Sequence, residues 1–492
     1  MIPLPAAELK IVGVSIWAVA PEIILSAGGM LLLVIGSGLK RGAQYLLLTL
    51  SLLILGGGAA AALLSTAHVR PSAFAGTVAL DGFAIFFKLV LIGGAMLSVL
   101  AAHHFLHYER APATEFFGLV MFATVGMMLM ASATDLILLF VALETFSLAL
   151  YVMAAFRRSR LDSQESALKY FLTGSFSSAF FLYGTALAYG AVGSTRLSAI
   201  SSAISKGQGS NGLLLAALAL LLIGLAFKIG AVPFHMWTPD AYQGAPSPVV
   251  GFMAAGSKVA GFAALLRLLV ATFPQTGIDW KPVVMVLSVA SMLLGSVVAV
   301  AQTNIKRMLA YSAIAHSGFL LLGVIASNDR GVSGSLFYLA VYTFTIVGAF
   351  AVVYAVGRPG EPRIGLDDFR GLWSRQPFLA VTFALLLISL AGIPPTGGFW
   401  AKFEVFSAAA ASGEYPLVVV GVLSSAVAAF FYLRIIVLMF LSDESDWGSE
   451  LEPSPAPGAG FAVIVACAVV LVLGVLPSPL LDLAREAVLL PR

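Results

Sequence analysis

Four ionisable side chains lie inside long apolar runs of this sequence. They are Glu144 in LLFVALETFSLALY, Lys228 in LLLIGLAFKIGAVPFHMWTP, Lys258 in MAAGSKVAGFAALL and Lys402 in LAGIPPTGGFWAKFE. A charge at the centre of a bilayer costs about 2.5–3.5 kcal/mol on insertion scales, so the four would cost on the order of 10 kcal/mol if they faced lipid. We therefore expect them to face polar partners or water inside a helix bundle, where a row of such groups can relay protons.

One acid among three lysines suits proton transfer for an electrostatic reason. Burial disfavours the charged form of a lysine, whereas a nearby carboxylate favours it. A change in the influence of Glu144 could therefore make a lysine release or accept a proton. A single buried Lys–Glu pair could equally be a packing device, but that interpretation does not explain four residues on several helices.

Lys169 in ESALKYFLTGSF, His235 and His316 are further candidates for the same path. Lys169 lies about two turns from the end of its predicted helix, so its long side chain could reach the membrane surface. The two histidines could extend a hydrated path between the lysines. Each histidine could equally be a packing residue with satisfied hydrogen bonds.

Two apolar segments contain helix-breaking residues close to these lysines. Gly230 and Pro233 follow Lys228, and residues 392–398, GIPPTGG, precede Lys402. Irregular backbone at membrane depth is tolerated only where it lines a cavity or is buried in protein. The first break is expected to supply free backbone groups beside Lys228. A matched pair of interrupted helices also indicates inverted repeats with the ion path at the breaks, although the prolines could instead only kink two long helices.

Composition places the chain among multi-pass membrane proteins. Of its 492 residues, 60% are hydrophobic and 10% are charged, and the mean hydropathy is +0.99. A soluble protein of this length could not bury that much apolar surface. The net charge of +3 does not indicate a nucleic-acid partner. The single cysteine, Cys467, excludes an internal disulfide framework and a cysteine-ligated cluster built by this chain alone.

The predicted fold is all-α, with about fourteen membrane helices and two inverted five-helix repeats. A membrane helix needs about 20 apolar residues, and the apolar runs lie near 16–38, 44–65, 80–102, 114–132, 134–156, 166–190, 213–238, 246–272, 283–303, 308–327, 333–356, 377–411, 416–441 and 459–478. Helices 7 and 12, at 213–238 and 377–411, are expected to be discontinuous. Five spans separate them, so the repeats enter the membrane from opposite sides. The predicted divisions are 1–112 for helices 1–3, 113–272 for helices 4–8, 273–441 for helices 9–13, and 442–492 for an acidic connection and helix 14.

The positive charges predict the orientation. Twelve of the 27 Lys and Arg residues fall in connections that follow odd-numbered spans, namely Lys40, Arg41, Arg110, Arg157, Arg158, Arg160, Lys306, Arg307, Arg358, Arg363, Arg370 and Arg375. Cytoplasmic connections carry an excess of such residues. We therefore expect both termini on the periplasmic side. The N-terminal MIPLPAAELK lacks the features of a cleavable signal peptide, so the first membrane helix is expected to direct insertion.

No connection is long enough to hold a nucleotide, flavin or iron–sulfur centre. The longest are 191–212, 357–376 and 442–458. His103, His104 and His107 place two imidazoles on one helix face, but no acid or further histidine nearby completes a metal site. We expect no metal and no cofactor in this chain.

Several long stretches resemble the antiporter-like membrane subunits of respiratory complex I, NADH:quinone oxidoreductase. They are GLAFKIGAVPFHMWTPDAYQGAPSPVVGFMAAGSKVAGFAALLR, TNIKRMLAYSAIAHSGFLLLG and LAGIPPTGGFWAKFEVF, with ALETFSLALYVMAAF and ESALKYFLTGSFSSAFFLYG in agreement. The chain is most similar to the N-type, the relative of the mitochondrial second membrane subunit. The resemblance covers predicted helices 4–13, and the terminal helices agree mainly in number.

The resemblance implies specific roles for the buried groups. Glu144 matches the helix-5 carboxylate, and Lys228 and Lys258 match the lysines of helices 7 and 8. Lys402 matches a helix-12 residue that is lysine in the N-type and glutamate in the M-type, and Lys169 matches an additional N-type lysine. Glu144 and Lys228 would then gate protonation, Lys258 would be the central relay, and Lys402 the group on the exit side.

The resemblance also implies the setting in which this chain works. It would be a proton-translocating subunit in a bacterial inner membrane, driven by quinone reduction elsewhere in the complex. Its partners would be the M-type subunit on one side and the K- and J-type subunits on the other, besides the lipid bilayer. The complex would use NADH, FMN, iron–sulfur clusters and a quinone.

Three other functions fit the same features. The chain could belong to a multisubunit sodium/proton antiporter, although Lys402 argues mildly against the types found there. It could belong to a membrane-bound hydrogenase or a photosynthetic relative. It could also be a spacer with no pumping role. The dependence of transport on sodium would separate the first of these from complex I, and mutants of the buried groups would test the last.

Overall fold

The computed structural model describes residues 15–39, 43–207, 211–273, 277–356, 365–442 and 457–487. Its α-helices are α1 (Ala20–Gly38), α2 (Gln44–Leu64), α3 (Gly82–Tyr108), α4 (Ala113–Ser132), α5 (Leu136–Ala154), α6 (Leu161–Val192), α7 (Leu197–Ser205), α8 (Asn211–Ile229), α9 (Trp237–Gly244), α10 (Ser247–Leu265), α11 (Gly277–Val300), α12 (Ile305–Ala326), α13 (Asp329–Val356), α14 (Leu372–Arg375), α15 (Pro377–Ala391), α16 (Gly397–Ala411), α17 (Tyr415–Leu441), α18 (Pro457–Val475) and α19 (Ser478–Glu486). Two short strands, β1 (Arg70–Ala73) and β2 (Val78–Leu80), complete the regular elements.

The predicted fold class, an all-α multi-pass membrane protein, is confirmed. Within the described residues, thirteen helices are long and apolar enough to cross a membrane. The remaining predicted helix, helix 12 at 377–411, is the pair α15 and α16, which the structure separates at residues 392–396. Predicted helix 7 is likewise divided into α8, which ends at Ile229, and the short α9, which begins at Trp237. Both interruptions lie where glycine and proline predict them.

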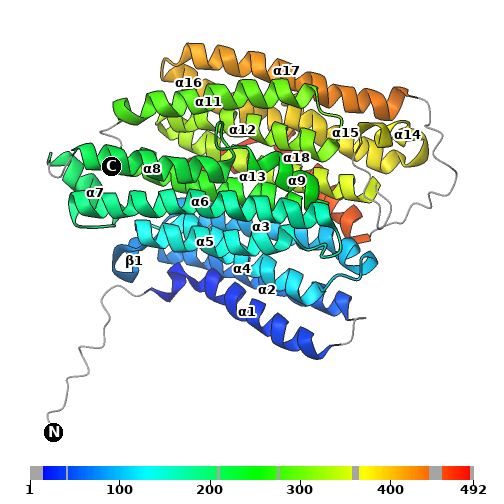
Figure 1. Ribbon diagram of the computed structural model, residues 1–492, viewed down its shortest axis with the longest axis horizontal. Coiled ribbons are helices and arrows are strands. Elements are labelled where there is room, and N and C mark those ends of the chain that lie inside the picture. Colours follow the sequence, from blue (N-terminus) through cyan, green and yellow to red (C-terminus); the bar gives the residue numbers. More distant parts are fainter. Residues whose placement is uncertain are drawn as a thin grey trace, which may run out of the picture.

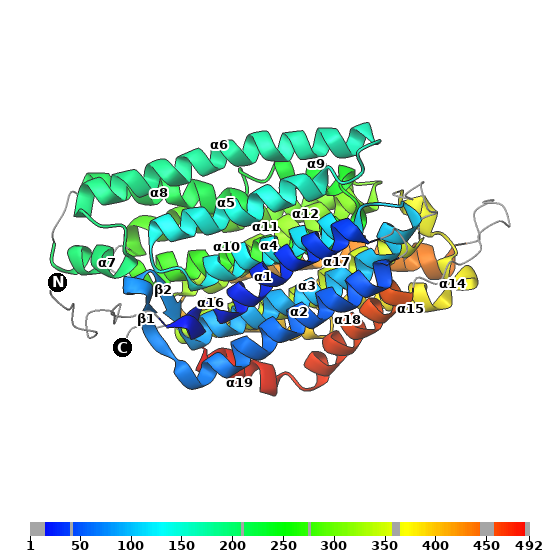
Figure 2. The same cartoon turned by 90° about the horizontal axis from the view of Figure 1, so that it is seen from below.

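The membrane helices run side by side along one direction, as Figures 1 and 2 show. The hairpin of β1 and β2 and the short helix α7 lie at one end of the bundle, and α14 lies at the opposite end. In Figure 2, α1 begins and α18 ends at the end that carries the hairpin. Both described ends of the chain therefore lie on one side of the bundle, as expected when a chain crosses the membrane an even number of times.

Two sets of five helices make corresponding contacts. In the first set, α4 packs on α5 and α10, and α6 packs on α8 and α9. In the second set, α11 packs on α12 and α17, and α13 packs on α15 and α16. Because five spans separate each helix from its counterpart, the counterparts run in opposite directions. These contacts are those of two inverted five-helix repeats.

The helices that hold the centre of the bundle differ from those at its surface. The apolar part of α10 is wholly buried, and almost all of α12 and α13 is buried as well. By contrast, only about a third of the apolar part of α1, α2 and α17 is buried inside the chain, and the rest is half-buried or exposed at its surface. Side chains carried by α10 and α12 are therefore far from lipid.

Two of the described connections contain regular elements. β1 and β2 pair antiparallel within residues 65–81, with Ala73 opposite Val78. Val78 also bridges to Ala133, and Asp135 to Arg196, so the hairpin end of the bundle is joined across several connections. The predicted connection 191–212 contains the amphipathic helix α7. Most of the acidic connection 442–458 lies outside the described residues, as do Lys40, Arg41, Arg358 and Arg363.

Candidate functional site

The first interruption ends a helix with an unpaired carbonyl. Gly230 follows α8 in the left-handed conformation, with φ of 69°, which glycine adopts without steric cost. The amides of Gly230 and Ala231 donate back to the carbonyls of Phe227 and Ala226. This C-terminal motif satisfies earlier carbonyls and leaves that of Ile229 without a partner in its own helix.

Lys258 of α10 and Ser317 of α12 meet this carbonyl. The Lys258 ammonium donates to the Ile229 carbonyl at 2.9 Å and also to the Ser317 hydroxyl. The Ser317 hydroxyl in turn donates to the same carbonyl at 2.5 Å. The C-terminal end of a helix carries partial negative charge, so it is a favourable partner for a buried cation.

The second interruption repeats this arrangement with other helices. Gly392, with φ of 83°, follows the last residue of α15, Ala391. The Lys402 ammonium donates to the Ala391 carbonyl at 2.8 Å and to the Ser425 hydroxyl of α17 at 2.8 Å. Ser425 also donates to the Ala391 carbonyl at 3.5 Å. Each break therefore presents one helix-end carbonyl to one lysine and one serine.

The lysine that contacts the first break is Lys258, whereas the sequence predicted Lys228. The break was expected to provide backbone groups for Lys228, but the Lys228 ammonium donates instead to the Ser147 hydroxyl of α5 at 2.7 Å. The rings of Phe146, Tyr151 and Tyr170 lie 4.9, 5.6 and 5.6 Å from the same nitrogen. Lys228 precedes the last residue of α8, so its side chain leaves the helix on a different side from the free carbonyl.

Glu144 and Lys228 are close but do not touch. Among the ion pairs of the described residues, none joins the Glu144 carboxylate to Lys228. Glu144 accepts a hydrogen bond from Ser178 of α6, and Ser147 lies about one turn further along α5. The acid can therefore act on Lys228 through its electric field, while a hydroxyl makes the direct contact.

His316 lies next to Ser317 in α12 and is buried among tyrosines. Its Nδ1 lies 2.6 Å from the Tyr338 hydroxyl, and its Nε2 lies 3.3 Å from the Tyr432 hydroxyl. Tyr432 also hydrogen-bonds to Ser312. Both ring nitrogens thus have polar partners that connect α12 to α13 and α17.

A small cavity lies between His316 and the second break. It has a volume of about 10 Å³ and is lined by His316, Tyr342 and Ser389, and by Ala401, the residue before Lys402. The buried hydroxyls of Tyr342 and Ser389 have no hydrogen-bond partner among the described residues. A cavity of about this size with polar groups in its wall can hold one water molecule.

Comparisons with known proteins agree with this arrangement. The sequence profile described as "NADH:quinone oxidoreductase/Mrp antiporter, TM" matches residues 133–428, which include both interrupted helices. The chain is 46% identical over 421 residues to NADH-quinone oxidoreductase subunit N of Trichlorobacter lovleyi, covering 85% of each chain. It belongs to this family of membrane subunits.

Two further members of the family extend the comparison. Subunit N of Mycobacteroides abscessus is 52% identical over 387 residues, which are 76% of this chain and 72% of that one. A chain of respiratory complex I from Thermus thermophilus, solved with bound aureothin, superposes with a TM-score of 0.81 at 38% identity. That superposition covers 94% of this chain and 99% of the other, so the family fold accounts for nearly the whole sequence.

Two of the predicted residues lie apart from the buried lysines of this family member. Lys169 is half exposed and pairs with Glu165 at 2.8 Å and with Asp240 of α9 at 3.4 Å. Asp240 pairs in addition with Arg307. His235 lies between α8 and α9, and its Nδ1 has no hydrogen-bond partner among the described residues. The structure joins neither residue to Lys228 or Lys258 by a hydrogen bond within its described part.

The sequence reasoning did not single out three buried cationic contacts. Lys88 of α3 pairs with Glu22 of α1 at 2.8 Å and donates to the Ala18 carbonyl at 2.7 Å, and both charged side chains are almost fully buried. Glu22, an acid within the first apolar run, is the sequence feature that could have indicated this buried ion pair. Lys306 was assigned to a connection, but the structure buries it in the first turn of α12, where it donates to the Ala245 carbonyl at 2.8 Å.

The third contact joins Arg267 to Asp81, the residue that caps α3. The guanidinium makes two hydrogen bonds of 2.9 Å to the carboxylate. Burial opposes ionisation of Asp81, but the Arg267 charge and its hydrogen bonds outweigh it and hold the pKa of the carboxyl below its ordinary value. This pair connects the N-terminal helices to the end of predicted helix 8.

We predict that Lys88 and Glu22 form a structural pair. Lys88→Met or Glu22→Gln alone should leave an uncompensated buried group and destabilise the chain by about 3–5 kcal/mol, whereas the double variant should recover most of that loss. Thermal unfolding of the purified complex measures the effect. A double variant no more stable than the singles, or a double variant that retains its stability but loses proton pumping, would contradict the structural role.

Proposed function

We propose that this chain is the N-type membrane subunit of an NADH:quinone oxidoreductase and moves protons across the bilayer when quinone is reduced elsewhere in the complex. The observation that carries the proposal is the row of three buried lysines, Lys228, Lys258 and Lys402. Each ammonium donates to a serine hydroxyl from another helix. The names of the related subunits support the assignment to this complex.

The charge of Glu144 controls the protonation of Lys228, and a neighbouring subunit can act on Glu144. Glu144 is only partly buried in the isolated chain, so a charge on a neighbouring subunit can act on it. A change at Glu144 alters the free energy of protonating Lys228 without any change in direct contact. In general, two unit charges about 4 Å apart interact by about 4 kcal/mol at an effective dielectric constant near 20, and the energy falls in inverse proportion to the distance. Moving one charge across 100 mV costs about 2.3 kcal/mol, so the two energies are of the same order.

From Lys258 the path continues through α12. The Ser317 hydroxyl accepts from Lys258 and donates to the Ile229 carbonyl, so it can exchange one partner for another when the lysine loses its proton. His316, the residue before Ser317, can take a proton at one ring nitrogen and release one at the other. A water molecule in the small cavity would join His316 to the break that holds Lys402. Lys402 is then the last buried group before the exit.

The surroundings of the chain follow from the same proposal. The subunit lies in a bacterial inner membrane with both termini on the periplasmic side. An M-type subunit contacts one face, and K- and J-type subunits contact the other. NADH, FMN, the iron–sulfur clusters and the quinone belong to other subunits, and this chain carries no cofactor. Residues 113–272 and 273–441 are its two functional repeats.

A sodium/proton antiporter subunit is the second candidate function. The matching family profile covers Mrp antiporters as well as NADH:quinone oxidoreductases. The identities of 46% and 52% to subunits N favour the oxidoreductase. Transport that requires sodium and proceeds without NADH oxidation would favour the antiporter instead.

We predict that Glu144→Ala and Lys228→Ala each reduce quinone-coupled proton pumping at least about fivefold, because the buried relay loses either its control or its first basic group. Oxidation of NADH by artificial electron acceptors should be unchanged, since it needs no membrane path. The half-exposed Lys169→Ala is the control and should have a much smaller effect. Membrane vesicles with a pH-sensitive dye report the pumping. Normal pumping in both variants would exclude the relay.

A second prediction concerns the small cavity. Tyr342→Phe combined with Ser389→Ala should slow coupled pumping about threefold or more, because the two hydroxyls that would hold the water are removed. Tyr354→Phe is the matched control, since the Tyr354 hydroxyl is also buried and unpartnered among the described residues but does not line this cavity. Equal pumping in the double variant, the control and the wild type would show that the path does not pass through the cavity.

A further inference from the structure

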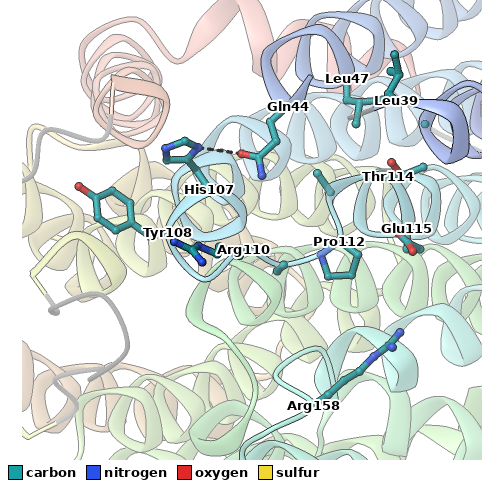
Figure 3. Close-up of a pocket in the computed structure, with 13 residues that line it drawn as sticks. Leu39, Gln44, Leu47, His107, Tyr108, Arg110, Pro112, Thr114, Glu115 and Arg158 are labelled. Carbon is teal, nitrogen blue, oxygen red and sulfur yellow. Dashed lines mark hydrogen bonds between the residues drawn. The ribbon is translucent and has the colours of Figure 1, made fainter. Parts of the chain in front are cut away.

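A large polar cavity lies at one end of the bundle. It has a volume of about 1050 Å³ and is lined by residues at the adjoining ends of α1 and α2, by the α3–α4 connection and by Arg158 of the α5–α6 connection. Gln44, His107, Arg110, Glu115 and Arg158 contribute its polar wall, as Figure 3 shows. We call this cavity the boundary pocket. None of its residues belongs to the proposed proton path.

Two guanidinium groups in the boundary pocket have no acidic partner. Arg110 and Arg158 make no ion pair and no side-chain hydrogen bond with any described residue. Their neighbours in sequence behave differently, since Arg157 pairs with Glu109 and Arg160 pairs with Asp162. The protein therefore satisfies some of its cations here and leaves two available to a ligand.

The boundary pocket also contains an acid. Glu115, in the first turn of α4, lines the same cavity, is exposed, and has no ion-pair partner among the described residues. The His107 ring is held by a contact of 3.1 Å between its Nδ1 and the Gln44 side-chain oxygen (Figure 3). A ligand that fits must therefore offer negative charge to the two arginines and positive charge to Glu115.

Apolar side chains lie both in the wall of the boundary pocket and on the surface of the two neighbouring helices. Leu39 and Leu47 line the cavity on the side of α1 and α2. Further along these two helices, Leu31, Val34 and Leu46 are exposed large apolar side chains. Hydrocarbon chains could lie against this surface while a polar headgroup occupies the cavity. Basic pockets between membrane helices on the cytoplasmic side bind phosphate-containing lipid headgroups, and the positive charges predict that side for the connections at this end of the bundle.

We propose that the boundary pocket binds a phospholipid whose headgroup carries an ammonium beside its phosphate, as phosphatidylethanolamine does. Arg110 and Arg158 contact the phosphate, for which the planar guanidinium offers paired donors. Glu115 contacts the ammonium. A purely anionic lipid would satisfy the arginines but would place negative charge near Glu115, so the presence of both signs favours the zwitterionic headgroup.

The test uses the whole complex in nanodiscs that contain equal amounts of phosphatidylethanolamine and phosphatidylglycerol. A photoreactive phosphatidylethanolamine is added, and mass spectrometry measures crosslinking to the peptide that spans residues 107–115. The wild type should be labelled there, and unlabelled phosphatidylethanolamine should compete better than phosphatidylglycerol. Arg110→Gln with Arg158→Gln should reduce the labelling at least about threefold. Glu115→Gln should remove the preference and make phosphatidylglycerol an equal or better competitor.

Arg160→Gln is the control, because Arg160 is a nearby surface cation that already has a partner, and labelling should not change. Equal labelling of all variants would overturn the proposal. Better competition by phosphatidylglycerol in the wild type would also overturn it and would indicate an anionic lipid. Loss of a neighbouring subunit from the double arginine variant, with no labelling of the wild type, would indicate a protein partner instead. None of these readouts depends on proton pumping.

Discussion

An ammonium group inside a membrane needs oxygen atoms to replace the water it has left. A continuous helix offers none, because its carbonyls are used by its own amides. The two interrupted helices of this chain solve that problem with backbone alone. Where α8 and α15 stop, a left-handed glycine turns the chain away, and the carbonyl of the last helical residue is free to accept. Lys258 and Lys402 take those two carbonyls. The free carbonyls, and not an acidic side chain, hold the central cations.

Using neutral oxygens for this purpose has a functional consequence. A carboxylate in contact with a buried lysine would hold the proton firmly and would leave an uncompensated charge when the proton moved. A carbonyl and a serine hydroxyl stabilise the ammonium less strongly, and the hydroxyl can reverse its hydrogen bond when the lysine becomes neutral. Glu144 makes no ion pair with Lys228, whose ammonium donates to the Ser147 hydroxyl instead. The site therefore favours easy exchange of protons over tight ion pairing. The pair of Lys88 and Glu22, in which charges do touch, is better suited to joining α1 to α3.

The sequence was informative where a residue type does not suit its local sequence, such as a charge in an apolar run or a proline in a helix. Glu144, Lys228, Lys258 and Lys402 stand out because they interrupt apolar runs, and the two breaks stand out because glycine and proline interrupt helices. Both signals are local, so the number of helices and the two discontinuities could be predicted. The hydrogen-bond partner of each lysine could not be predicted. Whether Lys228 or Lys258 meets the first break depends on the side of the helix from which each side chain leaves, and on packing between helices distant in sequence.

The same reason explains what was missed. The cavity beside His316 is formed by residues from α12, α13, α15 and α16, and no local pattern predicts that Tyr342 and Ser389 will line the same cavity. Lys306 was placed in a connection because charged residues usually mark the end of a membrane helix, whereas here the carbonyl of Ala245 accepts its ammonium inside the protein. Charges that are satisfied by backbone atoms leave no partner to find in the sequence.

A cryo-electron microscopy map of the intact complex, at a resolution that shows ordered water, would test the contacts of the buried lysines most directly. We expect density linking Lys258 to the Ile229 carbonyl and Lys402 to the Ala391 carbonyl, with water between His316 and the second break. Amines turned toward the headgroup region, or a dry apolar barrier between the two breaks, would contradict it.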